Sequence, residues 1–229
     1  MSKTLAIIHT TPVTIDSLKA LAATYLPAYN VINFVDDSIL PQLAKNGGKI
    51  EEVQDRLIQY SKYAEQVGAD VILNACSSVG EVVALAREVV SIPIIRIDDA
   101  MAEEAINRGK VIGVVATLST TLNPTLRLLK TKANELSQSV EFKEVLAEEA
   151  YKLLISGDPT GHDNVLAEVL TELGKRVDVV VLAQASMARV IGKLPEEIRS
   201  KFLTSPELGM ARVKDIMEGN VSLNGINRD

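Results

Sequence analysis

Two pairs of segments repeat along this chain at nearly the same distance, and this repeat limits the possible folds more than any other feature. Residues 3–15 align with residues 110–122, and residues 68–78 align with residues 176–186. The offsets are 107 (110 minus 3) and 108 (176 minus 68), so both alignments fit one duplicated unit. The repeat predicts two similar lobes of about one hundred residues each.

The aligned positions carry identical or similar residues at the points where strands are expected to begin and end. The matched pairs are Lys3 with Lys110, Ile7 with Val114, Thr10 with Thr117, Thr14 with Thr121, Asp70 with Asp178, Val71 with Val179, Ala75 with Ala183 and Ser78 with Ser186. In the same alignment the only cysteine, Cys76, falls on Gln184. The lobes therefore share a framework but differ at this position.

Short apolar runs alternate with segments of helical spacing in both halves, which predicts an α/β fold. The expected strands are 5–8, 31–35, 69–75, 92–97, 111–116, 140–145 and the run before Gln184. The expected helices are 15–25, 50–67, 81–90, 98–108, 124–136, 164–175, an interrupted one after Ala188, and 206–219, with loops at 41–49 and 156–163. This pattern predicts two pseudo-symmetric, doubly wound parallel-sheet lobes, with 1–97 plus 206–229 in the N-terminal lobe and 98–205 in the C-terminal lobe.

Charge and composition exclude several classes of protein. A net charge of -6 and a pI near 5.1 argue against nucleic acid or an anionic membrane surface as a partner. One cysteine and two histidines give neither a disulfide framework nor a metal site, and no motif requires a cofactor. No apolar stretch is long enough to span a bilayer, and residues 1–12 do not resemble a signal peptide, so we expect a cytoplasmic protein.

Four short loops at the carboxyl ends of the expected strands are candidate ligand-binding segments, because parallel α/β sheets bind ligands at that edge. They contain His9, Thr10 and Thr11; Cys76, Ser77 and Ser78; Thr117, Ser119, Thr120 and Thr121; and Gln184, Ala185 and Ser186. Their hydroxyl and backbone N–H groups can hold a small carboxylate without any arginine. The alternative is that the serines and threonines only cap helices.

Cys76 is expected where a buried strand passes into a helix. Unpaired N–H groups and the helix dipole favour an anion there, so we expect the pKa of Cys76 to lie below that of a free cysteine. The alternative is a small buried residue that only packs. His9 is a conceivable partner for Cys76, or a loop histidine bonded to the backbone, and His162 is either a lid group or a surface residue.

The motifs NACSSVGE, at residues 74–81, and VVLAQASMA, at residues 180–188, resemble the two cysteine motifs of the aspartate/glutamate/hydantoin racemase superfamily. The resemblance covers most of the chain. It implies two lobes that face each other across a cleft, with a cysteine from each lobe acting as acid or base on opposite faces of the carbon beside a carboxylate. By this resemblance Cys76, Ser77 and Ser78 form one half of the site, and His9, Thr10 and Thr117 contact the substrate carboxylate.

The second motif of the family usually reads LGCAGMA, whereas this chain has Gln184 in place of the cysteine. An amide does not exchange a proton near neutral pH, although it can orient a carbonyl or a water. We therefore expect a cofactor-independent racemase or isomerase that acts through one thiol on a small amino acid or related acid. A decarboxylase, lyase or hydrolase, or a non-catalytic carboxylate-binding protein, are the alternatives. The resemblance also makes a homodimer plausible.

Overall fold

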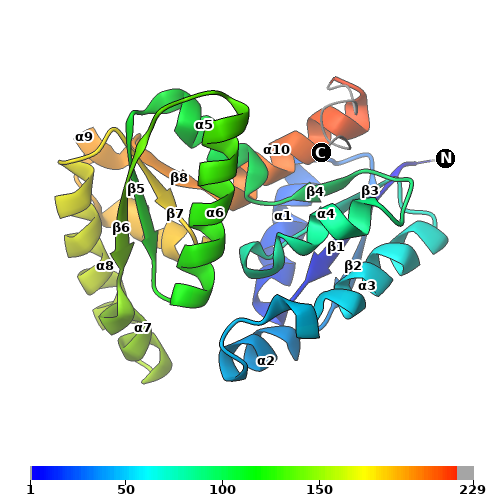
Figure 1. Ribbon diagram of the computed structural model, residues 1–229, viewed down its shortest axis with the longest axis horizontal. Helices are drawn as coiled ribbons and strands as arrows, with labels where there is room; N and C mark the ends of the chain where they lie inside the picture. Colours follow the sequence, from blue (N-terminus) through cyan, green and yellow to red (C-terminus); the bar gives the residue numbers. More distant parts are fainter. Residues whose placement is uncertain (1, 221–229) are drawn as a thin grey trace. The chain divides into compact units, whose positions relative to one another are not determined.

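The structure is a computed structural model that describes residues 2–220, and the chain divides into two compact α/β units (Figure 1). The first unit comprises residues 1–97 together with the chain from residue 206 onward. The second comprises residues 98–205. Each unit contains one sheet of four parallel strands flanked by helices, so the α/β fold predicted from the sequence is confirmed.

The sheet of the first unit has the strand order β2-β1-β3-β4, in which all neighbours are parallel. Helices α2, α3 and α4 pack on one face, and α1 and α10 pack on the other. β3 is buried along its whole length because both of its faces are covered. The bounds are β1(Thr4–His9), α1(Ile15–Tyr25), β2(Asn30–Val35), α2(Ile39–Lys45), α3(Gln54–Gln66), β3(Val71–Asn74), α4(Val82–Arg87), β4(Ile94–Arg96) and α10(Ser205–Glu218), with short 3-10 turns η1(Pro12–Thr14), η2(Ile50–Glu52) and η3(Ser77–Val79).

The sheet of the second unit repeats this arrangement with the order β6-β5-β7-β8, again all parallel. Apolar residues of α7, α8, η4 and α9 pack on one face of it. α5 and α6 complete the unit, and both carry buried apolar residues. The bounds are α5(Asp99–Arg108), β5(Val111–Ala116), α6(Ser119–Glu135), β6(Glu141–Leu146), α7(Glu148–Ile155), α8(Pro159–Gly174), β7(Val179–Leu182), η4(Ala185–Lys193), α9(Glu196–Arg199) and β8(Phe202–Thr204).

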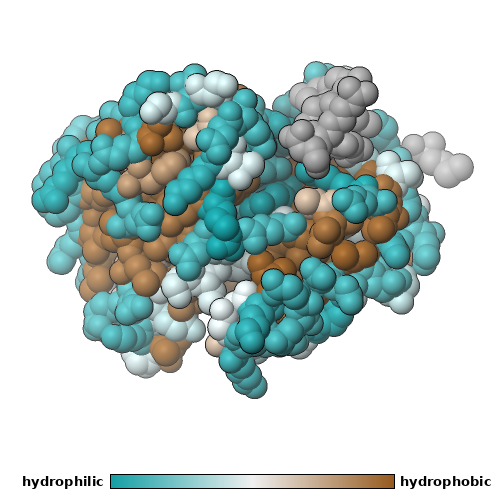
Figure 2. Space-filling view, viewed as in Figure 1, coloured by the Kyte–Doolittle hydropathy of each residue, from teal (hydrophilic) through white to brown (hydrophobic). Residues whose placement is uncertain are grey.

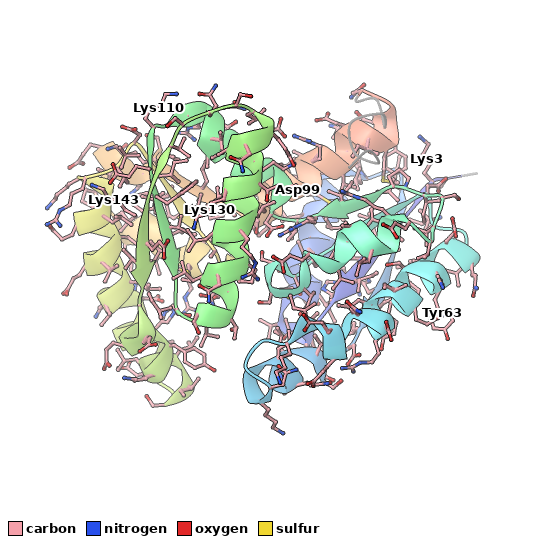
Figure 3. The ribbon with its side chains drawn as sticks, viewed as in Figure 1. Lys3, Tyr63, Asp99, Lys110, Lys130 and Lys143 are labelled. Carbon is pink, nitrogen blue, oxygen red and sulfur yellow. The ribbon has the colours of Figure 1, made fainter. Side chains whose placement is uncertain are left out.

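An aspartate before the third strand of each unit makes the same contact, as the aligned repeat suggests. Asp70 Oδ2 accepts the backbone N–H of Thr4 at 2.7 Å. Asp178 Oδ2 accepts the N–H groups of Lys110 and Val111, each at 2.8 Å. In both units the carboxylate therefore links the residue before the third strand to the start of the first strand, β1 or β5. Lys3 and Lys110, labelled in Figure 3, stand just before β1 and β5.

Several helices depart from the sequence-based expectations, and prolines explain most of the differences. The expected loop at 41–49 includes most of α2, whose Pro41 lies in the first turn and so removes no helical hydrogen bond. The expected loop at 156–163 contains the start of α8, where Pro159 occupies the first position and the Asp158 side chain accepts the N–H of Gly161 at 2.8 Å. α6 begins at Ser119 and contains Pro124. The sequence analysis also missed α7, α9 and β8.

The surface in the view of Figure 2 is mostly hydrophilic over the outer helices, with apolar patches between them. Within residues 2–220, none of the helices combines the length and apolar character needed to cross a membrane.

Candidate functional site

Cys76 follows β3 and is the residue that precedes the short turn η3. Its backbone N–H donates to Oδ1 of Asn74 at 3.1 Å, and this Asx-type turn bends the chain sharply at the end of the strand. The residue as a whole is partly exposed, although it packs against the core and protein atoms surround its sulfur. The sequence therefore places the thiol at the carboxyl edge of the sheet, as expected, but before a three-residue turn instead of a long helix.

Burial raises the pKa of the Cys76 thiol above its ordinary value. Hydrogen bonds from the Thr10 and Ser78 hydroxyls and from the N–H groups of Ser78 and Val79 favour the thiolate and offset part of this effect. The expectation of a lowered pKa was wrong, because burial disfavours the anion more than these donors stabilise it. Within residues 2–220, the buried Thr10 hydroxyl has no partner at normal hydrogen-bond distance and angle. Its interaction with the sulfur is therefore weak.

His9 and Cys76 project from opposite faces of the sheet. His9 is in phase with Leu5 and Ile7, which pack in the core beneath α1 and α10, whereas Cys76 packs with the core beneath α2, α3 and α4. A pair between His9 and Cys76, considered from the sequence, is therefore absent.

The ring nitrogens of His9 lie 2.8 Å from Thr14 Oγ1 and 2.9 Å from Asn33 Oδ1, and the residue is 0% exposed. Burial lowers its pKa below the ordinary 6.5. Because Asn33 Oδ1 can only accept, Nε2 carries the proton of the neutral ring. Both nitrogens are occupied, so the predicted contact between His9 and a substrate carboxylate does not fit this geometry.

The hydroxyl-bearing residues of the first unit have different surroundings. Thr10 is 2% exposed and lies on the Cys76 face of the sheet. The hydroxyl of Thr11 accepts the N–H of Val13 at 3.4 Å and so caps η1, as the helix-cap alternative supposed. Ser78 is buried against the sulfur, and Ser77 is partly exposed. Thr10 and Ser78 thus surround Cys76 directly.

Gln184 occupies the position in the second unit that Cys76 occupies in the first: it follows β7 and precedes a 3-10 turn. Its Oε1 accepts both the backbone N–H of Thr117, at 2.7 Å, and the Thr117 hydroxyl, at 2.9 Å. Thr121 is buried in the first turn of α6, whereas Ala185 and Ser186 are exposed. The donors that Thr117 was expected to offer a carboxylate are therefore occupied by the side chain of Gln184.

Arg96, at the end of β4, was missed by the sequence analysis. It is paired in register with Asn74 and is 9% exposed. A Cβ atom added to Gly80 would lie 2.4 Å from its guanidinium, so the glycine provides the space in which Arg96 packs beside the Cys76 loop. A single charged residue within the otherwise apolar run at 92–97 was the signal in the sequence.

His162 lies on α8 and is 1% exposed, so it is neither a lid nor a surface residue. Its Nδ1 is 2.9 Å from Asp163 Oδ1. Although burial opposes ionisation of Asp163, hydrogen bonds from His162, Arg189 and Lys193 hold its pKa at about 2. Arg189 and Lys193 belong to η4, so this cluster fastens the segment after Gln184 to α8.

Among residues 2–220, no group of three or more His, Cys, Asp or Glu side chains is arranged to hold a metal ion.

The sequence model of the Asp/Glu/hydantoin racemase family matches residues 7–213. The chain belongs to this family. The match includes both units, both strand-end motifs and Gln184, and it makes the protein a racemase-type enzyme. No curated protein matches the chain in a sequence search.

Solved structures of racemases share the fold of this family member. The glutamate racemase RacE1 of Bacillus anthracis has a TM-score of 0.72 at 18% identity, covering 99% of this chain and 84% of its own. The allantoin racemase of Klebsiella pneumoniae has a TM-score of 0.68 at 16% identity, covering 99% and 93%. An aspartate racemase homologue of Pyrococcus horikoshii has a TM-score of 0.70 at 16% identity, covering 95% and 100%. These similarities establish the two-lobed fold.

Proposed function

We propose that this racemase-family enzyme transfers a proton at the carbon beside the carboxylate of a small amino acid or related acid, with Cys76 as its only proton-carrying thiol. The observation that supports this most is the polar surroundings of the sulfur: the Ser78 hydroxyl, the N–H groups of Ser78 and Val79 and, more weakly, the Thr10 hydroxyl favour the thiolate. Such donors stabilise the thiolate whenever it forms. The glutamate, aspartate and allantoin racemases with this fold support a substrate that carries a carboxylate or an amide carbonyl.

A raised thiol pKa is compatible with this chemistry. A hydrogen on the carbon beside a carboxylate is very weakly acidic, and a thiolate of higher pKa is the stronger base toward it. The cost is a smaller fraction of thiolate at neutral pH, which the Thr10 and Ser78 donors partly offset. When Cys76 is protonated, the same group is the acid that returns a proton to the carbon. One thiol therefore serves both half-reactions on the face that it reaches.

The test is proton NMR in D2O with a panel of small amino, hydroxy and dicarboxylic acids. We expect the α-hydrogen signal of at least one acid to disappear with the wild-type protein and to persist with Cys76→Ser. Thr24→Ala is the control, because it removes an exposed hydroxyl on α1 that donates to the carbonyl oxygen of Ala20 at 3.1 Å, outside the candidate loops. Consumption of an acid without deuterium at its α-carbon would point instead to a decarboxylase, lyase or hydrolase. No change with any acid in either protein would contradict the proposal.

A further inference from the structure

A buried threonine follows the first strand in both units, and in the second unit its donors point at the neighbouring strand end. In the second unit the N–H and hydroxyl of Thr117, which is 3% exposed, converge on Oε1 of Gln184 at 2.7 and 2.9 Å. In the first unit the aligned Thr10, 2% exposed, interacts with the sulfur of Cys76. The same corner of the fold thus lies beside a thiol in one unit and holds an amide oxygen in the other.

The two donors also fix the orientation of the Gln184 amide. A backbone N–H cannot donate to an NH2 group, so the oxygen must face Thr117 and Nε2 must face away. Within residues 2–220, Nε2 has no hydrogen-bond partner, and the residue is partly exposed. Two N–H donors are therefore held in a fixed direction and remain available to a ligand.

We propose that Thr117 forms an anion-stabilising donor pair that Gln184 fills with its own oxygen, so that Gln184 binds an oxygen of a small ligand through Nε2. The identity of the bound oxygen, a carboxylate or carbonyl of a small acid, rests on the proposed function. The Thr117 donor pair does not, because it follows from the two hydrogen bonds to Gln184.

The donor pair is tested without any substrate by placing a cysteine at position 184. In the Cys76→Ser background, Gln184→Cys leaves one thiol, and its alkylation by iodoacetamide is followed across pH. We expect the further change Thr117→Val to slow alkylation near neutral pH at least about threefold, because a hydrogen bond to the thiolate is lost. Thr120→Val, in the same turn, is the control for loss of a hydroxyl. Equal rates with and without the Thr117 hydroxyl would overturn the donor pair.

The role of Nε2 is tested with two substitutions of similar length. Gln184→Glu keeps an oxygen for Thr117 but replaces the outward donor with an acceptor, and Gln184→Met removes both. We expect each to weaken the binding of a small acid, measured by isothermal titration calorimetry, about tenfold or more, with an unchanged melting temperature. Binding by Gln184→Glu at the wild-type affinity would overturn the role of Nε2.

If the wild type exchanges no acid, the proposed function fails, while the alkylation series still decides whether Thr117 is an anion-stabilising pair.

Discussion

At the scale of single residues, Cys76 shows how one position balances two opposing effects. Burial favours the neutral thiol, and four donors favour the anion, with burial the larger effect. Because Cys76 is the only cysteine, any thiol-specific reagent reports on it alone. Its reactivity can therefore be measured before a substrate is known.

The first prediction concerns the alkylation of Cys76 across pH. Because burial raises its pKa, the midpoint of the rate profile should lie above the value of about 8.5 for a free cysteine. Ser78→Ala removes one hydroxyl donor and should move the midpoint further up. A wild-type midpoint at or below the free value would show that burial does not dominate at this thiol.

The second prediction concerns His9, whose pKa burial lowers below 6.5. The unfolded chain binds its proton at higher pH than the folded protein, so the free energy of unfolding should fall as pH drops through 6.5 toward the lower folded pKa. Asn33→Asp places a carboxylate 2.9 Å from Nε2 and should reverse the sign by raising the pKa. NMR titration of the two histidines measures this, and a wild-type His9 that titrates above 6.5 would refute it.

At the scale of elements, the cluster around Asp163 joins α8 to η4. Asp163→Asn removes the carboxylate that Arg189 and Lys193 contact at 2.9 and 3.1 Å. We expect the free energy of unfolding, measured with urea at neutral pH, to fall by about 1–2 kcal/mol. The loss is no larger because solvent screens the partly exposed Arg189 and Lys193 side chains.

The Asp163 contribution is present above the ordinary pKa of 3.8 and disappears as pH falls through about 2. Glu149→Gln, which removes an exposed contact of 3.8 Å with Lys152, is the control and should change stability little. Similar losses for the two variants would mean that the cluster does not fasten η4 to α8.

Sequence patterns located the elements that alternate cleanly and missed those whose start depends on tertiary contacts. α1 and β5 have the predicted bounds because a capping turn or a buried apolar run defines them locally. α7 and β8 are short, with eight and three residues, and packing against α8 and β7 determines them. In the site, the duplication aligned Thr10 with Thr117 and Cys76 with Gln184. It could not reveal on which face of the sheet His9 lies or that Arg96 fills the space above Gly80.

At the scale of the whole molecule, α10 belongs to the first unit although it follows the second in sequence. Met210, Val213 and Met217 of this helix are buried in the core with strands β1, β3 and β4. Gly209 allows the close approach, because a Cβ there would lie 2.6 Å from the carbonyl oxygen of Ile97.

Gly209→Ala tests this packing. The added methyl has no room beside the Ile97 backbone, so we expect a loss of about 1–3 kcal/mol in the free energy of unfolding. Gly192→Ala is the matched control, since a Cβ at that glycine meets nothing within 4 Å. Chemical denaturation measures both, and equal stability of the two variants would show that α10 can shift away from Ile97 at little cost.

The return of the chain to the first unit also has a consequence for synthesis on the ribosome. Residues 98–205 all emerge before α10 does, so the second unit can complete its core while the first still lacks the helix that covers one face of its sheet. Until then Leu5, Ile7 and Leu73 keep part of their apolar surface in water. The segment translated first is thus the last to finish folding, and during that interval it is the part of the nascent chain most exposed to aggregation or to capture by a chaperone.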